Sequence, residues 1–131
     1  MMKGVYYLVA RLGANTKIMV GTKKTLFRKG YYCYVGSAMN GLEHRVGRHL
    51  GREKKMRWHI DYLLRYAKVI DVVMIQTSRN IECKLSKKIE KAASFTVKGF
   101  GSSDCRCAGH LHYSKKNPAG KLVNMARLMK F

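Results

Sequence analysis

Two short segments of the chain contain side chains that could act together on a phosphate group. YVGSA at 34–38 precedes RVGRH at 45–49, so a glycine and Ser37 stand just ahead of a basic segment. Arg45 and His49 are four residues apart and would share one face of a helix. Backbone N–H groups, a hydroxyl and a guanidinium can all bind one phosphate. The pattern therefore indicates a phosphate-binding cleft.

Acidic side chains, which many phosphate-cleaving enzymes use to bind metal ions, are scarce. The chain has seven. They are Glu43, Glu53, Asp61, Asp71, Glu82, Glu90 and Asp104, and no two are closer than eight residues apart. Two-metal nucleases need several converging carboxylates. Phosphoryl chemistry in this chain would instead use a single metal ion held by one carboxylate, or would use no metal ion.

Four β-strands are expected in the first third of the chain. Apolar residues occupy even and odd positions over 4–12, which is typical of a central strand covered on both faces. Residues 17–27 are β-branched and interrupted at 21–24, which favours a pair of short strands. The segment 31–36 is another strand, with Gly36 at its end.

Apolar spacing predicts two helices after these strands. Leu42, Val46 and Leu50 recur every four residues and define the first, and apolar residues over 60–67 define the second. The basic residues on the opposite side and flanks of the first helix are Arg45, Arg48, His49 and Arg52. The first helix should therefore present a basic face.

A strand and a third helix follow. Residues 69–75 form a continuous apolar strand, and apolar spacing over 81–92 predicts a helix. Thr77 or Ser78 is placed to cap this helix, and Glu82 falls in or near its first turn.

The last third of the chain is expected to be a long loop and a helix. Residues 94–116 are rich in glycine and serine and look irregular. Asn117 and Pro118 suit the cap and first position of a helix over 117–131. Its apolar stripe consists of Leu122, Met125, Ala126 and Met129.

The order of these short motifs resembles the GIY-YIG nuclease superfamily over roughly 4–93. The matching features are GVY at 4–6, YVG at 34–36, RVGRH at 45–49 and an isolated Glu82. This resemblance implies an α+β fold in which helices flank a small antiparallel sheet. It also implies a divalent-metal-dependent endonuclease that hydrolyses phosphodiester bonds in DNA.

A closer resemblance extends along the chain to Tyr113. With WHIDYLL at 58–64 and GFGSSDCRC at 99–107, the sequence looks like an uncharacterised prokaryotic branch of the superfamily. Some members of this branch are fused to endonuclease III, which suggests a role in DNA repair. The chain departs from typical members by an inserted hairpin around 13–29 and by an extra residue, Gly41, and the superfamily's late asparagine has no evident counterpart.

Five residues receive catalytic roles from the resemblance. Tyr6 and Tyr34 become paired active-site phenols, and Arg45 stabilises charge on the phosphorane. Glu82 holds one divalent cation, Mg²⁺ or Mn²⁺, and His49 is a polar neighbour. The alternatives are ordinary ones: the tyrosines pack in a sheet, Arg45 and His49 form a solvated helix face, and Glu82 merely complements a helix dipole.

The charge of the chain predicts its partner. Lys and Arg number 27 against seven acids, a formal net charge of +20. A folded domain with that charge is expected to bind a polyanion, and its dispersed cations favour sequence-independent contact with the nucleic-acid backbone. We expect DNA, with RNA as an alternative. The residues expected to contact it are Gly36, Ser37, Arg48, Arg52, Lys54, Lys55 and His59.

Cysteine and histidine are close together in the glycine-rich segment. Cys105, Cys107 and His110 could bind Zn²⁺, since thiolates and imidazoles suit this ion. The spacing is not a common finger spacing, so buried thiols or a redox-sensitive pair are the favoured interpretation.

The expected organisation is a single α+β domain over 1–131. The domain has a core at about 4–93, a glycine- and cysteine-rich loop at 94–116, and a C-terminal helix at 117–131. Neither a targeting segment nor a long apolar stretch is visible, so we expect a cytoplasmic protein with reduced thiols that does not enter a membrane. Two alternatives to the nuclease stay open: a catalytically inactive nucleic-acid-binding module, and a zinc-stabilised RNA-binding accessory protein.

Overall fold

The chain folds as an α+β protein built on an antiparallel five-stranded sheet. The computed structural model describes residues 3–38, 41–51, 59–78, 81–98, 100 and 109–128. The sheet order is β5-β1-β4-β7-β6, and β2 and β3 form a separate two-stranded sheet. The strands are β1 (Gly4–Leu12), β2 (Thr16–Val20), β3 (Lys23–Phe27), β4 (Gly30–Ala38), β5 (Lys68–Gln76), β6 (Phe95–Thr96) and β7 (Leu111–Ser114). The helices are α1 (Leu42–Leu50), α2 (His59–Leu63), α3 (Glu82–Ala92) and α4 (Ala119–Leu128).

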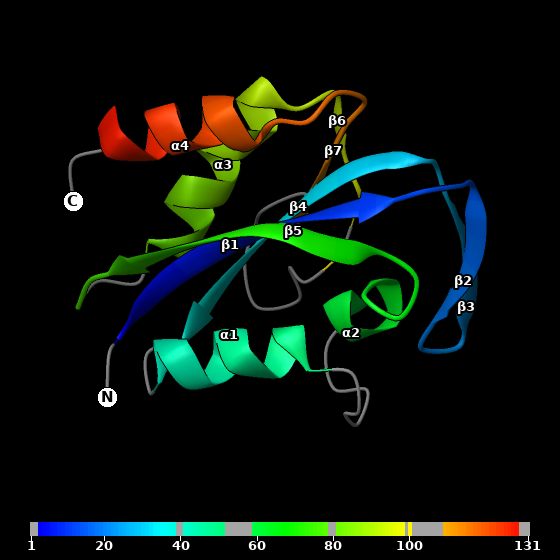
Figure 1. Cartoon of the computed structure of the whole chain (residues 1–131), viewed down its shortest axis with the longest axis horizontal. Coiled ribbons are helices and arrows are strands. Elements are labelled where there is room, and N and C mark those ends of the chain that lie inside the picture. Colours follow the sequence, from blue (N-terminus) through cyan, green and yellow to red (C-terminus); the bar gives the residue numbers. More distant parts are fainter. Residues whose placement is uncertain are drawn as a thin grey trace.

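Helices cover the sheet on both faces, α1 and α2 on one and α3 and α4 on the other (Figure 1). Strand β1 contributes to two buried clusters because successive side chains point to opposite faces. Tyr6 and Leu8 belong to one cluster, and Val5, Tyr7 and Val9 to the other. The prediction of a strand covered on both faces is therefore confirmed.

The hairpin predicted around 13–29 is present as β2 and β3. Gly21 has a φ of 63°, a left-handed conformation that glycine adopts readily in the turn between the strands. Ile18 and Phe27 are buried on one face of the hairpin. Met19 and Leu26 are exposed on its other face.

Helix α1 buries a different face from the one predicted. Val46 is buried as expected, whereas Leu50 is 57% exposed and His49 only 3% exposed. Val46 and His49 are three residues apart and lie on the same face. The imidazole tolerates burial because it forms a hydrogen bond in the interior, so the expectation of His49 on a basic outer face is wrong.

Three predicted boundaries also need correction. Gly36 does not end its strand, because β4 continues to Ala38. Helix α2 is shorter than 60–67 and ends at Leu63. Neither Thr77 nor Ser78 caps α3: its N-cap is Ile81, without a side-chain cap hydrogen bond.

The segment predicted as an irregular loop contains two strands. β7 pairs with β4, and β6 pairs with β7. This pairing satisfies backbone groups along β4 that would otherwise be buried without partners. A pattern of only two to four residues in each strand is too short to be detected by alternation.

The C-terminal helix begins as predicted. The Asn117 side-chain oxygen accepts a hydrogen bond from the Ala119 N–H at 3.0 Å, and Leu122 is buried against the sheet. Met129, the last predicted member of the stripe, lies outside the described residues. Within the described part of the chain, no helix is both long and apolar enough to cross a membrane.

His112 on β7 makes the stability of the fold depend on pH. Its Nε2 lies 2.7 Å from the Ser86 hydroxyl and its Nδ1 lies 2.7 Å from the Thr96 hydroxyl. Burial, aided by the nearby His110, lowers the pKa of His112 from 6.5 to about 4. The unfolded chain therefore binds a proton at this site more readily than the folded protein between these pH values.

We expect the free energy of unfolding to be undiminished above pH 6.5 and to fall by about 2–3 kcal/mol between pH 7 and pH 4.5 because of this one group. Urea unfolding at the two pH values measures the change. His112→Gln should remove most of the difference. An equal fall in the variant would assign the pH dependence to other groups.

Candidate active site

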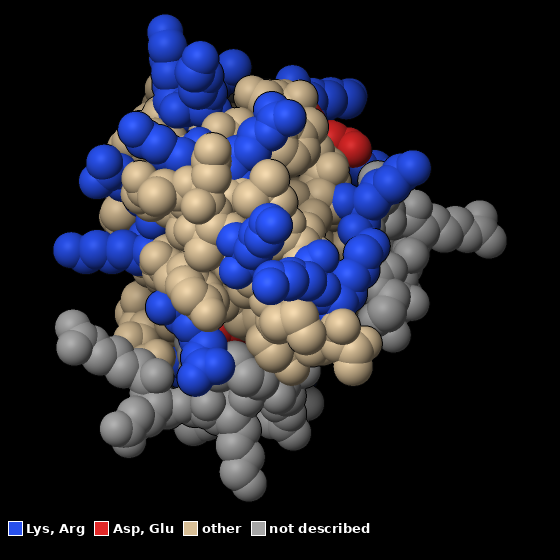
Figure 2. Space-filling model, turned by 90° about the vertical axis from the view of Figure 1, so that its right-hand side faces the viewer, with Lys and Arg blue, Asp and Glu red and all other residues tan. Residues whose placement is uncertain are grey.

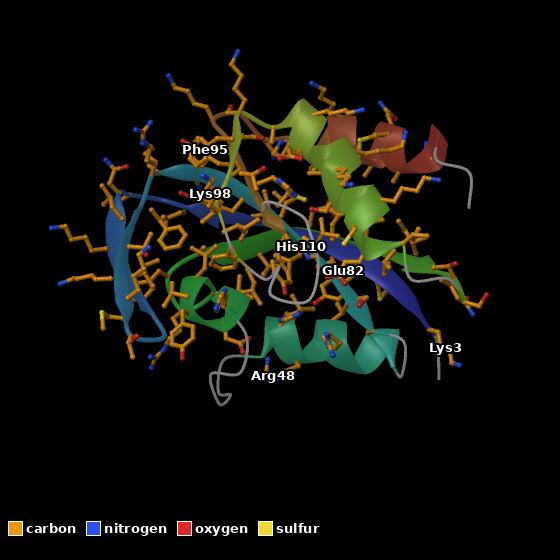
Figure 3. All side chains as sticks on the ribbon, turned by 180° about the vertical axis from the view of Figure 1, so that it is seen from behind. Lys3, Arg48, Glu82, Phe95, Lys98 and His110 are labelled. Carbon is orange, nitrogen blue, oxygen red and sulfur yellow. The ribbon has the colours of Figure 1, made fainter. Side chains whose placement is uncertain are left out.

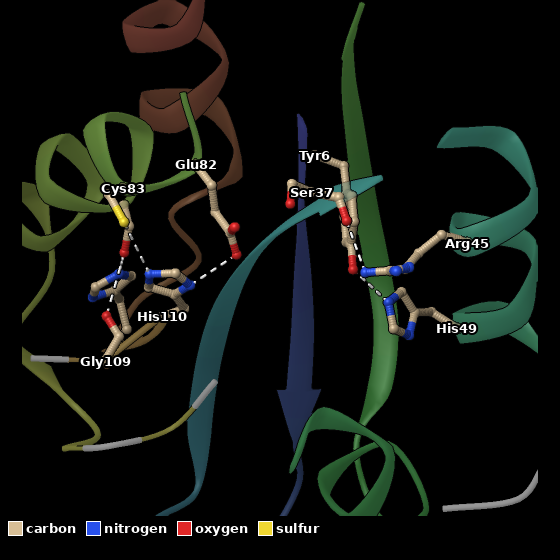
Figure 4. A network of polar contacts seen from close by, with 10 residues as sticks. Tyr6, Ser37, Arg45, His49, Glu82, Cys83, Gly109 and His110 are labelled. Atoms are coloured by element: carbon tan, nitrogen blue, oxygen red, sulfur yellow. Dashed lines mark hydrogen bonds and ion pairs between the residues drawn. The ribbon is translucent and has the colours of Figure 1, made fainter. Parts of the chain in front are cut away.

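Two tyrosines and a histidine meet on the α1 side of the sheet. Tyr6 on β1 and Tyr34 on β4 have ring centroids 6.4 Å apart, and the His49 ring lies 5.4 Å from Tyr6 and 6.1 Å from Tyr34. The Tyr6 hydroxyl and His49 Nε2 are 2.6 Å apart, which is a short hydrogen bond (Figure 4). The structure thus brings together three of the five predicted catalytic residues.

Gly36 provides the space that the Tyr6 ring occupies. It pairs with Tyr6 across β1 and β4. A Cβ at residue 36 would overlap the hydroxyl and ring atoms of Tyr6. The sequence predicts this glycine as a point of phosphate approach, and the structure adds a second reason for it: no larger residue fits beside Tyr6.

Gly36→Ala should displace the Tyr6 ring and lower the free energy of unfolding by about 1–3 kcal/mol from overpacking. Gly47→Ala is the matched control, because a Cβ there meets nothing within 4 Å. This control removes a helix-interior glycine and should gain about 0.5–1 kcal/mol. Urea unfolding measures both variants. Equal stability of the two variants would contradict a tight contact between residue 36 and the Tyr6 ring.

Arg45 reaches the same cluster from α1. Its Nη1 donates a hydrogen bond to the backbone carbonyl of Ser37 at 2.7 Å, so Ser37 positions the guanidinium through its main chain. The positive charge of Arg45 also acts on Tyr6, where it opposes the rise in pKa. Arg45 is therefore half-buried and held beside the tyrosine hydroxyl.

Asp61, which the sequence analysis does not single out, lies behind His49. This carboxylate on α2 is completely buried. Its Oδ1 is 2.9 Å from Arg48 Nη1 and 3.9 Å from His49 Nδ1. Arg48, predicted to bind nucleic acid, thus uses part of its guanidinium to hold Asp61. A lone acid between Ile60 and Leu63 in an apolar helix is the signal that could have identified it.

Glu82 approaches the tyrosines from the opposite side of the cleft. It lies in the first turn of α3, and Figure 4 shows Glu82 and His110 on one side of Tyr6 with Arg45 and His49 on the other. Glu82 Oε1 is 2.9 Å from His110 Nδ1. His110 Nε2 in turn lies 3.8 Å from the Cys83 sulfur.

Burial and the same neighbouring charges act on both tyrosine hydroxyls. Burial raises the pKa of Tyr6, the neighbouring Tyr34 adds to the rise, and Arg45 opposes it. Burial also raises the pKa of Tyr34, with the Glu82 carboxylate as the next cause. Both phenols are therefore protonated at neutral pH, and either one needs a base to give up its proton.

Several predicted residues do not join this cluster. His59 is exposed at the start of α2 and meets Phe100 edge to face, with ring centroids 5.4 Å apart. Arg52, Lys54, Lys55, Cys105 and Cys107 lie outside the described residues. Among the described residues no group of three or more His, Cys, Asp or Glu could hold a metal ion by itself. Zinc binding at His110 with the two cysteines stays a prediction.

The sequence was compared with protein families, with curated proteins and with solved structures. No curated protein and no solved structure matches it significantly. One family does match, over residues 5–130, and its description is Domain of unknown function DUF123. Because that match spans nearly the whole sequence, the chain belongs to the DUF123 family.

Proposed function

We propose that this chain is an endonuclease of the GIY-YIG type that hydrolyses phosphodiester bonds of DNA with the help of one divalent cation. The observation that carries the proposal is the 2.6 Å hydrogen bond between the Tyr6 hydroxyl and His49 Nε2, flanked by Arg45 and Glu82. Phosphodiester hydrolysis can use a phenol and a base to move a proton, a guanidinium to stabilise charge and a carboxylate to hold a metal ion. Tyr6, His49, Arg45 and Glu82 supply these four groups.

Tyr6 would pass a proton from water to His49. As the water oxygen attacks phosphorus, its proton moves to the Tyr6 oxygen and the Tyr6 proton moves to His49 Nε2. The raised pKa of Tyr6 is compatible with this step, because the phenol never has to exist as a free anion. The P–O bond to the leaving strand then breaks, and that oxygen leaves as a hydroxyl after taking a proton from solvent.

Arg45 would stabilise the charge that builds up on the phosphate oxygens. One of its nitrogens is fixed to the Ser37 carbonyl, and the remaining N–H groups can donate toward the cleft. A guanidinium held in place before substrate binds needs little reorganisation when the charge develops.

Glu82 would hold the divalent cation. Mg²⁺ and Mn²⁺ prefer oxygen ligands, and Mg²⁺ commonly uses one or two carboxylates together with water and phosphate oxygens. A half-buried carboxylate anchored on His110 and close enough to affect Tyr34 fits this donor set. When bound, the cation supplies Lewis-acid stabilisation of the phosphate and the leaving oxygen.

Asp61 would act on the reaction through His49. For Tyr6 to donate a proton, Nε2 must be unprotonated, so the ring proton is on Nδ1, which faces the Asp61 carboxylate. The same carboxylate stabilises the imidazolium that forms after proton transfer. Asp61 is thus a positioning residue behind the base.

Asp61→Asn should lower kcat by about 10²-fold with little change in KM, because the amide keeps the shape but loses the charge. Single-turnover cleavage at saturating DNA measures the effect. Asp71→Asn is the control. The Asp71 carboxylate accepts a hydrogen bond from the backbone N–H of Val72, and no contact joins it to Tyr6, His49 or Arg45 among the described residues. Equal kcat values for the two variants would remove Asp61 from the mechanism.

The surface charge supports DNA as the substrate. Figure 2 shows Lys and Arg spread over the end of the molecule that the hairpin β2–β3 forms, with little acid among them. Such a surface binds phosphates without reading sequence and loses affinity steeply with salt. A role in DNA repair is proposed from the resemblance alone. A cytoplasmic location is proposed from the sequence alone.

A plasmid and branched-DNA nicking assay tests the proposed function. Purified protein with Mg²⁺ or Mn²⁺ is expected to nick DNA and to stop when EDTA removes the cation. An RNA of the same sequence measures the alternative substrate. Salt-sensitive DNA binding without any metal-dependent nicking would favour the inactive binding module, and stoichiometric zinc in an RNA-binding, non-cleaving protein would favour the accessory protein.

A further inference from the structure

A pocket of about 320 Å³ opens beside the candidate active site. It lies between the hairpin β2–β3, the start of α2 and the residues that follow β6. Its lining residues are Val20, Lys23, Thr25, Phe27, His59, Val97, Lys98 and Phe100. Phe27 and Phe100 meet edge to face, with ring centroids 6.3 Å apart, and are almost completely buried. They form an apolar floor.

The mouth of the pocket is basic. Lys23, Lys98 and His59 are exposed, and none of the described residues that line the pocket is acidic. An apolar interior beneath two lysines and an imidazole matches a nucleotide, which combines a flat base with a negatively charged phosphate. The volume is near the lower end of the range of about 300–1,000 Å³ for ligand pockets and suits one base rather than a stacked pair.

The pocket shares a wall with the candidate active site. The Phe100 ring lies 6.3 Å from Tyr34 and 5.4 Å from His59. In the view from behind, Lys98 lies between the hairpin and the Glu82–His110 pair (Figure 3). A DNA strand whose phosphate is bound beside Tyr6 and Arg45 would therefore have a neighbouring nucleotide within reach of the pocket.

We propose that this pocket binds one unpaired nucleotide of the DNA strand next to the bond that is cleaved. The base lies against Val20, Val97 and the phenylalanine floor, and its phosphate contacts the lysines at the mouth. A base in an intact duplex would first have to be unstacked and unpaired, whereas an unpaired base enters at little cost. The inference rests on the proposed function and adds a substrate class: DNA with a bulged or otherwise unpaired nucleotide.

The test compares binding to two labelled duplexes that differ by one bulged nucleotide. Fluorescence anisotropy in EDTA and low salt measures Kd without cleavage. Wild-type protein should bind the bulged duplex about tenfold more tightly. Thr25→Trp fills the pocket from β3 and should abolish the preference. Leu26→Trp adds the same side chain to the same strand on the exposed face and should retain it.

Lys98→Ala provides a second variant at an exposed position that does not threaten the fold, and it should reduce the preference about threefold or more. Equal wild-type affinity for the two duplexes, or a full preference in both Thr25→Trp and Lys98→Ala, would overturn the proposal. If both duplexes are cleaved at the same rate in a metal-dependent reaction and bind equally well, the nucleotide-binding role of the pocket is overturned and the proposed nuclease function stands. A preference that depends on Thr25 in a protein that never cleaves would leave the pocket intact and overturn the nuclease.

Discussion

Glu82→Ala is expected to reduce Mg²⁺-dependent nicking by about 10³-fold while the protein still binds DNA at low salt. Among the described acids, Glu82 is the one whose charge acts on both Tyr6 and Tyr34. In the proposed mechanism, the substitution removes the carboxylate that would hold the cation beside the phosphate, and such a cation contributes several kcal/mol to catalysis. A plasmid nicking time course at saturating protein measures the loss.

Glu90→Ala is the matched control for this prediction. Glu90 lies on the same helix, α3, and is exposed, with only a long 3.5 Å contact to the Thr96 hydroxyl. Both substitutions change the net charge equally, so an effect on DNA binding through charge alone would appear in both. Similar nicking by Glu82→Ala and Glu90→Ala would mean that Glu82 holds no catalytic cation.

Tyr6→Phe is the second substitution with a large expected effect. It removes the hydroxyl that is bonded to His49 and leaves the ring in place, so the fold should be retained. Loss of a proton-transfer group reduces rates by about 10²–10⁴-fold, and we expect about 10³-fold here. The measurement is single-turnover cleavage over a range of pH.

Tyr7→Phe tests whether the effect belongs to the hydroxyl of Tyr6 and not to tyrosine in β1 generally. Tyr7 is the next residue along the strand, equally buried but on the α3–α4 face. Its hydroxyl has no hydrogen-bond partner among the described residues. This variant should cleave DNA normally and be at least as stable as wild type. A normal rate for Tyr6→Phe would remove the proton relay from the mechanism.

The sequence predicts the sheet well where strands are long and apolar. β1 and β5 stand out because nine residues of each carry the pattern. The short strands β6 and β7 could not be predicted, since β7 is formed by pairing with β4 across a separation of some 80 residues and β6 is formed by pairing with β7. Local propensity contains little information about such pairing.

Some residues of the candidate site could be predicted from the sequence and others could not. Motifs identify Tyr6, Tyr34 and Arg45, and the fold brings them together. The burial of His49 could not be predicted from apolar spacing, because a hydrogen bond to Tyr6 compensates for burying a polar ring. Asp61 was missed for a similar reason: a buried acid has no place in a pattern that counts only apolar residues.

Cleavage by the double variant Tyr6→Phe/Glu82→Ala, measured beside both single variants and wild type in Mg²⁺, tests most directly whether these residues form one phosphodiester-cleaving centre. Groups that act as a unit give non-additive losses. We therefore expect nicking by wild type, a loss of about 10³-fold in each single variant, and little further loss in the double variant. Absence of Mg²⁺-dependent nicking by wild type, or a double-variant loss equal to the product of the two single losses, would contradict a shared centre.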